Sequence, residues 1–153
     1  MSSSHLTEGQ IAFIDELAEM LSIWSIPAKA ARLYGYLYLM NDPVGLDDIA
    51  RDLQMSRSHA HTAARMLEMN GNVRAMATRG SKRIVYVCGD DPGTPLRRQI
   101  ANLGRMAEFV ATSASRVATD GAAARLDHLA AFLKQLKGAM HAVVEPDGTT
   151  SGD

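Results

Sequence analysis

Hydrophobic side chains near the N-terminus recur at intervals of three and four residues, which is the spacing of an amphipathic helix. One apolar row is Ile11, Ile14, Leu17, Leu21 and Trp24. A second row beside it is Phe13, Leu17, Met20 and Trp24. Thr7 is placed to cap such a helix, so the pattern predicts a helix within residues 7–25. So wide an apolar face needs deep burial or two packing partners, one of which can belong to another chain.

The next segment is apolar on most sides and predicts a core helix over residues 27–40. Pro27 suits the first helical position, where its missing N–H is not needed. Gly35 lowers helix stability, which indicates that a neighbouring element approaches closely there. The turn-forming residues 41–43 end the helix. The positions expected in or near the core are Ala30, Ala31, Leu33, Tyr34, Leu37, Tyr38 and Met40.

Two short helices separated by a brief turn are expected next, over residues 46–53 and 56–70. Ser56 is a suitable N-cap for the second helix, and Gly71 can end it in the left-handed conformation. The side chains expected to point inward are Leu46, Ile49, Ala50 and Leu53 from the first, and Ala60, Ala63, Met66, Leu67 and Met69 from the second. Two short helices joined in this way, with arginine on the second, form the helix-turn-helix pattern.

Two short runs with strand-like composition follow, over residues 73–77 and 82–88, and residues 78–81 have the composition of a hairpin turn. A basic hairpin directly after the second helix of a helix-turn-helix is a wing. Residues 90–93, Asp-Asp-Pro-Gly, are expected to be a linker.

The last part of the sequence has the heptad-like spacing of packed helices. Over residues 94–118 the apolar positions are Leu96, Ile100, Leu103, Ala107, Val110, Ala114 and Val117. Over residues 122–143 they are Leu126, Leu129, Leu133, Leu136, Met140 and Val143. Both rows alternate steps of three and four, and Asp120-Gly121 interrupts them, so we expect an antiparallel helical hairpin. The polar tail over residues 144–153 is expected to be disordered.

The segments IPAKAARLYGYLYL, LDDIARDLQMSRSHAHTAARMLEMNGNVR and RGSKRIVYV resemble the winged helix-turn-helix domain of the MarR superfamily, in particular its GbsR-like branch. His61 departs from the small hydroxyl residue that is common there. The resemblance implies a dimeric DNA-binding regulator. The expected fold class is mainly α (α+β), with an N-terminal dimerisation helix within 7–25, a winged helix-turn-helix domain over 26–90 and a dimerisation hairpin over 94–143.

The charge distribution supports a polyanion site within the winged region. The formal net charge is −1, but residues 1–50 contain two basic and seven acidic side chains, whereas residues 51–83 contain seven basic and two acidic ones. Arginine can bridge O6 and N7 of guanine, hydroxyl groups can reach bases or phosphates, and a basic hairpin can enter a narrow minor groove. The predicted DNA-binding residues are Ser56, Arg57, Ser58, His61, Thr62, Arg65, Arg79, Lys82 and Arg83. The leading prediction is a homodimeric transcriptional repressor that binds a pseudo-palindromic duplex operator.

Two other functions remain open at this point. One is a winged helix that binds protein, with its arginines simply solvated. The other is a sensor gated by oxidation of Cys88 or by a small apolar or cationic effector lodged between the dimerisation helices and the winged domain. Small residues such as Ala107 and Ala114 leave room for an effector, but they equally suit tight helix packing.

Several functional classes are excluded or disfavoured. His59 and His61 point about 200° apart on a helix and cannot grip one metal ion, so no metal or cofactor is expected. Phosphate loops, nucleophile elbows and partnered carboxylate pairs are absent from the sequence, so we do not expect an enzyme. The single cysteine and the lack of a long apolar run or an N-terminal signal pattern favour a cytoplasmic protein without a membrane span.

Overall fold

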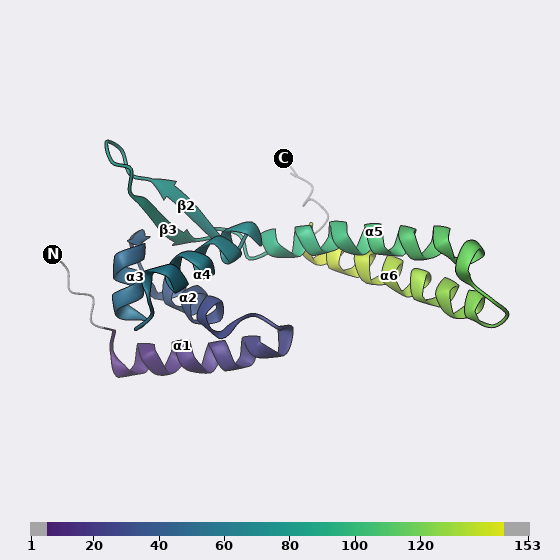
Figure 1. The fold of residues 1–153 in the computed structure, drawn as a ribbon, viewed down its shortest axis with the longest axis horizontal. Helices are drawn as coiled ribbons and strands as arrows, with labels where there is room; N and C mark the ends of the chain where they lie inside the picture. Colours follow the sequence, from purple (N-terminus) through teal and green to yellow (C-terminus); the bar gives the residue numbers. More distant parts are fainter. Residues whose placement is uncertain (1–5, 146–153) are drawn as a thin grey trace, which may run out of the picture. The chain divides into compact units, whose positions relative to one another are not determined.

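The computed structural model describes residues 6–145, which divide after Asp91 into two compact units (Figure 1). The elements of the first unit are α1 (Glu8–Leu21), a 3-10 turn (Ser22–Trp24), α2 (Ala28–Leu39), β1 (Val44–Gly45), α3 (Leu46–Asp52), α4 (Arg57–Met69), β2 (Val73–Ala77) and β3 (Ile84–Cys88). Those of the second are α5 (Thr94–Val117) and α6 (Ala122–Val144). The predicted α+β fold class is confirmed.

The first helix begins as expected but ends earlier than its apolar rows do. Thr7 Oγ1 accepts the Gln10 N–H at 3.2 Å, and Gln10 Oε1 accepts the Thr7 N–H at 2.9 Å, which forms a capping box. After Leu21 the chain tightens into the 3-10 turn, and Ser25 takes a positive φ of 59°. Trp24 therefore leaves the helical row and is 70% exposed. Ile14 and Leu21 of the first apolar row are buried, but Ile11 of that row is exposed. Phe13 and Met20 of the second row are exposed as well.

The core helix α2 begins one residue later and ends one residue earlier than the predicted range of 27–40. Pro27 is the N-cap, with ψ of 139°, and not the first helical residue. A Cβ built at Gly35 would lie 3.3 Å from Cδ2 of Leu17 and 3.6 Å from Cα of Ile14, so the close approach of α1 is confirmed. Tyr36, which was not expected in the core, is buried there, whereas Tyr38 is exposed.

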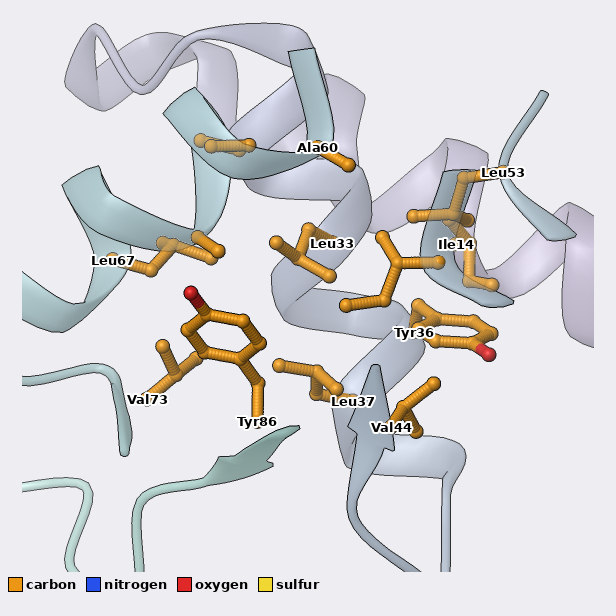
Figure 2. Close-up of a cluster of buried hydrophobic side chains, with 14 residues drawn as sticks. Ile14, Leu33, Tyr36, Leu37, Val44, Leu53, Ala60, Leu67, Val73 and Tyr86 are labelled. Carbon is orange, nitrogen blue, oxygen red and sulfur yellow. The ribbon is translucent and has the colours of Figure 1, made fainter. Parts of the chain in front are cut away.

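The core of the first unit lies where α2 meets α4, α3 and the sheet (Figure 2). Ala60, Ala63 and Ala64 are buried on α4, and their small side chains allow α4 to lie close to its neighbours. Met69 was expected to point inward, but it is exposed, because it lies two residues and about 200° from the buried Leu67 on the helix. The larger buried side chains labelled in Figure 2 are Ile14, Leu33, Tyr36, Leu37, Val44, Leu53, Leu67, Val73 and Tyr86.

The sheet is antiparallel with the strand order β1-β3-β2. The two-residue strand β1 was not predicted, because two residues are too short to show a strand pattern; it places Val44 opposite Tyr86 of β3. Strands β2 and β3 form the predicted hairpin. The Thr78 N–H donates to the Arg83 carbonyl at 3.1 Å and closes the turn, and β3 begins at Ile84 instead of residue 82.

The second unit is an antiparallel pair of helices, as predicted, but the packed face of α6 is rotated. Ala130 and Leu133 are buried, whereas Leu129, Leu136 and Val143 are exposed. A Cβ built at Gly104 of α5 would lie 3.0 Å from Nζ of Lys137, so the missing side chain leaves room for the lysine stem.

Two further predictions concern this unit. Ala107 and Ala114 are buried, which agrees with tight packing of the small residues in α5. Val144 continues α6 one residue beyond the predicted end, and the rest of the expected disordered tail lies largely outside the described residues.

Candidate nucleic-acid interface

Helix α4 presents one polar side to solvent. It buries Ala60, Ala63, Ala64 and Leu67 on the opposite side. All of the predicted outward residues are exposed, namely Arg57, Ser58, His61, Thr62 and Arg65. Their spacing places them in two neighbouring rows, 57-61-65 and 58-62, because residues four apart share a helix face. The structure therefore brings cationic, hydroxyl and imidazole groups together along the first turns of α4.

The hydroxyl groups at the start of α4 are partly engaged by the helix itself. Ser56 Oγ accepts the His59 N–H at 3.0 Å, which confirms the predicted N-cap. Thr62 Oγ1 donates to the Ser58 carbonyl at 3.0 Å. A hydroxyl group is both a donor and an acceptor. Ser56 thus retains its O–H as a donor, which suits a phosphate oxygen, whereas Thr62 retains lone pairs as an acceptor.

Both arginines of the outward rows have an acidic neighbour. Arg57 Nη1 lies 3.1 Å from Oδ1 of Asp47 on α3, and both side chains are about 70% exposed. Arg65 Nη1 lies 3.8 Å from Oε2 of Glu68, one helical turn further along α4. Exposed ion pairs of this kind contribute at most about 1 kcal/mol to stability. The arginines are therefore partly neutralised but remain accessible to a ligand.

The three predicted cations of the wing occupy different environments. Arg79 and Lys82 are exposed in the turn between β2 and β3, and neither forms an ion pair within residues 6–145. Arg83 instead turns back toward α3, where its Nη2 lies 3.1 Å from Oδ2 of Asp48. A Cβ built at Gly45 would lie 2.7 Å from Nε of Arg83, so the guanidinium group fits there because residue 45 is glycine. The wing thus has two unpaired cations in its turn and one held at its base.

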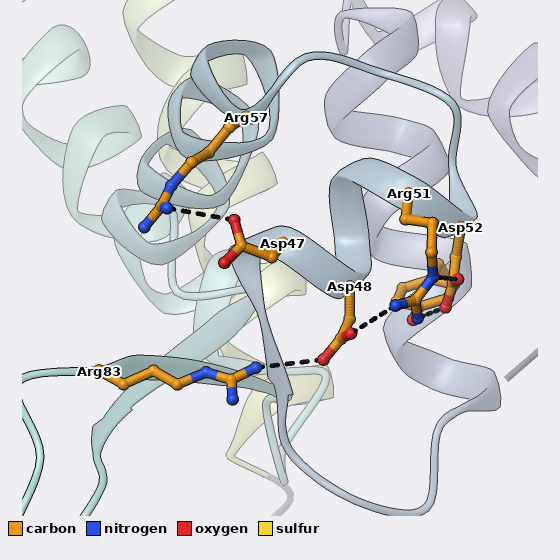
Figure 3. Close-up of polar contacts among 7 residues, drawn as sticks. Asp47, Asp48, Arg51, Asp52, Arg57 and Arg83 are labelled. Carbon is orange, nitrogen blue, oxygen red and sulfur yellow. Dashed lines mark hydrogen bonds and ion pairs between the residues drawn. The ribbon is translucent and has the colours of Figure 1, made fainter. Parts of the chain in front are cut away.

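A chain of polar contacts links the base of the wing to the core (Figure 3). Asp48 accepts from Arg83 and also from Arg51 Nη1, at 2.9 Å. Arg51 Nε donates to Oδ1 of Asp52 at 3.0 Å, and the buried Tyr36 donates its hydroxyl to Oδ2 of Asp52 at 2.7 Å. Burial raises the pKa of Tyr36, and the hydrogen bond to the Asp52 carboxylate raises it further. Helix α3 is therefore anchored to α2 at one end and to the wing at the other.

Sequence reasoning missed one cation beside α4. Lys29 is exposed near the start of α2, and its Nζ lies 2.8 Å from Nδ1 of His59. A lysine ammonium group has donors only, so His59 accepts through Nδ1. The two residues are 30 positions apart, and no periodicity relates them. The acidic partners Asp47 and Asp48 were missed for the same reason, because their contacts depend on how α3 meets α4 and the wing.

Comparisons with known proteins concern the sequence and the fold. No protein-family model matches the sequence. The HTH-type transcriptional repressor GbsR of Bacillus subtilis (strain 168) is 31% identical over 78 residues, which are 51% of this chain and 43% of that protein. The match therefore spans less than half the length of this relative. The resemblance to GbsR inferred from the sequence is confirmed.

The solved structures address the fold. A crystal structure of a transcriptional regulator matches 90% of this chain and 97% of its own with a TM-score of 0.80 at 18% identity. At this identity the likeness assigns a shared fold. The transcriptional regulator Tm0710 from Thermotoga maritima, at 17% identity over 88% of this chain and 92% of its own, gives a TM-score of 0.44, too low to add to that assignment.

Cys88 lies in the last strand of the winged helix, in surroundings that disfavour its thiolate form. Burial raises the pKa of its thiol, and the negative charge of Asp90 adds to this effect, while a hydrogen bond from Tyr38 opposes it. The thiolate form that reacts with oxidants is thereby disfavoured near neutral pH.

No group of three or more His, Cys, Asp or Glu side chains within residues 6–145 could hold a metal ion. None of the helices in that part of the chain combines the length and the apolar character that crossing a bilayer requires.

Proposed function

We propose that this protein is a non-enzymatic transcriptional regulator that binds double-stranded DNA sequence-specifically and acts as a repressor. The observation that supports this most is the row Arg57, His61 and Arg65 along the exposed side of α4, in the helix that follows the turn of a helix-turn-helix. In such folds the N-terminal part of this second helix contacts base edges in the major groove. The similarity to GbsR, which is named as a transcriptional repressor, points to the same role.

The proposed contacts follow from the chemistry of each group. Arg57 and Arg65 would donate to guanine O6 and N7, while Ser58, His61 and Thr62 would contact neighbouring bases or phosphates. Ser56 and the first amide groups of α4 would hold a phosphate. Arg79 and Lys82 would enter the adjacent minor groove, whose negative potential attracts cations. Arg83, at the base of the wing, would contact bases next to the wing turn, and Lys29 would add positive charge at the edge of this surface.

We further propose that the protein acts as a homodimer. Apolar side chains are exposed on both units. They include Met20 on α1, Trp24 in the 3-10 turn after it, Phe109 on α5 and Phe132 on α6. Phe109 and Phe132 are 67% and 54% exposed, which is costly for two phenylalanines unless a partner covers them. A two-fold dimer would bind a pseudo-palindromic operator with half-sites about 34–36 Å apart, or a multiple of that distance.

We also propose that a small-molecule effector binds this protein. The hairpin unit has an apolar hollow of about 380 Å³ lined by Phe109, Val110, Val117 and Leu126, with Ser113 and Arg116 as its polar groups. This hollow is a different place from the crevice that the sequence suggested. Whatever the site, an effector can change DNA affinity only by binding the free and DNA-bound states differently.

Selection from a randomised duplex library tests the proposed function. We expect the wild-type protein to enrich a motif with two related half-sites. Arg57→Ala should weaken binding to the enriched duplex by about 1–3 kcal/mol, whereas Arg57→Lys should keep the charge but lose discrimination at one base pair. Lys134→Ala, which removes one exposed cation from α6, is the matched control and should bind like wild type. Enrichment of no motif, or equal affinity for all duplexes, would contradict the proposal and favour a protein-binding winged helix.

A further inference from the structure

Two acidic residues at the start of α3 hold two arginines of the proposed DNA interface. Asp47 contacts Arg57 of α4, and Asp48 contacts Arg83 at the base of the wing (Figure 3). We propose that Asp47 and Asp48 are specificity-determining residues that bias these arginines toward base edges and away from phosphates. This inference rests on the proposed function, because it concerns how the same surface distinguishes one duplex from another.

The geometry leaves each arginine able to bind DNA while it is paired. The Arg57 pair uses a single nitrogen, Nη1, and a single oxygen, Oδ1 of Asp47, at 3.1 Å. A guanidinium group has five N–H donors in a rigid fork, so most of the donors of Arg57 remain for a ligand. The Arg83 pair likewise uses Nη2 and Oδ2 of Asp48. In both pairs a single contact to the carboxylate biases the direction of the fork.

A neighbouring carboxylate affects the two kinds of DNA contact differently. Attraction between arginine and phosphate is Coulombic, so an acidic group beside the guanidinium lowers it and also repels the phosphate. A guanine edge is uncharged and offers two acceptors, O6 and N7, that need correctly directed donors. The pair therefore weakens contacts that any sequence can make and preserves a contact that only some sequences offer.

The cations of the surface differ in their partners: Arg65 has a longer contact of 3.8 Å with Glu68 of its own helix. Arg79 and Lys82 form no ion pair within residues 6–145, so they are suited to sequence-independent attraction. Asp48 is held from both sides, by Arg83 and by Arg51, and its position is thereby fixed. Among the described residues Asp47 forms an ion pair with Arg57 alone, so its replacement breaks no larger network of ion pairs.

The test measures affinity for the selected duplex and for a scrambled duplex of the same length and composition. The variants are Asp47→Asn and Asp48→Asn. The control is Asp42→Asn, which removes the same charge from an exposed residue of the first unit that forms no ion pair in the described chain. We expect each of the two variants to bind the scrambled duplex roughly two- to five-fold more tightly per protomer than the control does, a range that corresponds to the loss of one exposed ion pair. Affinity for the selected duplex should stay the same or fall, so the ratio of the two affinities decreases.

Further measurements distinguish the outcomes. In the Arg57→Ala background, Asp47→Asn should behave like Asp42→Asn, because the arginine on which it acts is gone. Thermal unfolding shows whether each variant is folded. If Asp48→Asn does not fold, the result for Asp47→Asn alone tests the inference. An unchanged ratio, or the same change in Asp42→Asn, would overturn the inference and leave the proposed function intact. A wild-type protein that enriches no duplex would contradict the proposed function, and this inference with it.

Discussion

The hydroxyl group of Tyr36 on α2 donates a 2.7 Å hydrogen bond to Oδ2 of Asp52 at the end of α3. The side chain of Asp52 is 3% exposed, and its other oxygen accepts from Arg51. A carboxylate so deeply buried needs such partners, because an unsatisfied buried charge is strongly destabilising. The contact therefore ties the core to the helix whose first residues hold Arg57 and Arg83.

Replacement of Tyr36 tests this anchor. Tyr36→Phe keeps the ring but leaves the Asp52 carboxylate with one partner fewer, so we expect the free energy of unfolding to fall by about 1–3 kcal/mol. Urea denaturation near neutral pH measures the loss. Tyr38→Phe removes the hydroxyl group of an exposed residue whose hydrogen-bond partners, Tyr34 and Cys88, are uncharged, so stability should fall by less than about 1 kcal/mol. Equal stability of wild type and Tyr36→Phe would show that the hydrogen bond does not anchor α3.

The raised pKa of Tyr36 also predicts how stability depends on pH. Because burial and the Asp52 hydrogen bond raise this pKa above its usual value of 10.0, the folded state holds the phenolic proton more tightly than the unfolded state. Its contribution to stability is complete below about pH 10 and is lost as the pH rises above that value. Burial also raises the pKa of Tyr86, which acts in the same direction.

The measurement is urea denaturation at several pH values between about 8 and 11, which span the usual tyrosine pKa. Wild type should lose more stability over this range than Tyr36→Phe, since the variant lacks one of the contributing groups. Parallel curves for the two proteins would mean that Tyr36 titrates normally.

Local sequence features predicted the elements that form the interface. Ser56, the inward alanines and Gly71 defined α4 from its cap to its end, and the outward face followed from the helical period. Such local features do not predict which residues of different helices and strands contact one another. Tyr36 is buried because Asp52 of another helix satisfies its hydroxyl group, and the packed face of α6 follows Ala130 and Lys137 because Gly104 of α5 leaves room.

The proposed dimer predicts different effects for neighbouring residues of α6. Phe132 is exposed, so Phe132→Asp should leave the hairpin helical but place a charge in the dimer interface, and sedimentation should then show monomers. Lys134→Asp, which changes the charge by two units at an exposed site on another side of α6, should remain dimeric. Leu133 is buried within the chain, so Leu133→Asp should instead disrupt folding. A folded wild-type monomer at micromolar concentration would contradict the dimer.

The environment of Cys88 predicts that oxidation does not regulate this protein. Because burial raises the pKa of the thiol, little thiolate is available near neutral pH, and reaction with a maleimide or with peroxide should be slow. Cys88→Ser should bind the selected duplex with wild-type affinity, before and after peroxide treatment. Loss of DNA binding in wild type but not in Cys88→Ser on mild oxidation would instead support a thiol-gated sensor.

The most direct test of the central claim, that this surface binds DNA, is the salt dependence of affinity for a duplex. Seven basic side chains lie within residues 51–83, and most of them are exposed. If about four per protomer contact phosphates, a dimer neutralises about eight, and the logarithm of the affinity should fall against the logarithm of the salt concentration with a slope near −7. Fluorescence anisotropy with a labelled duplex at several salt concentrations gives this slope. A value near −7 is the predicted result, whereas a slope shallower than about −2 would contradict DNA as the partner of this surface.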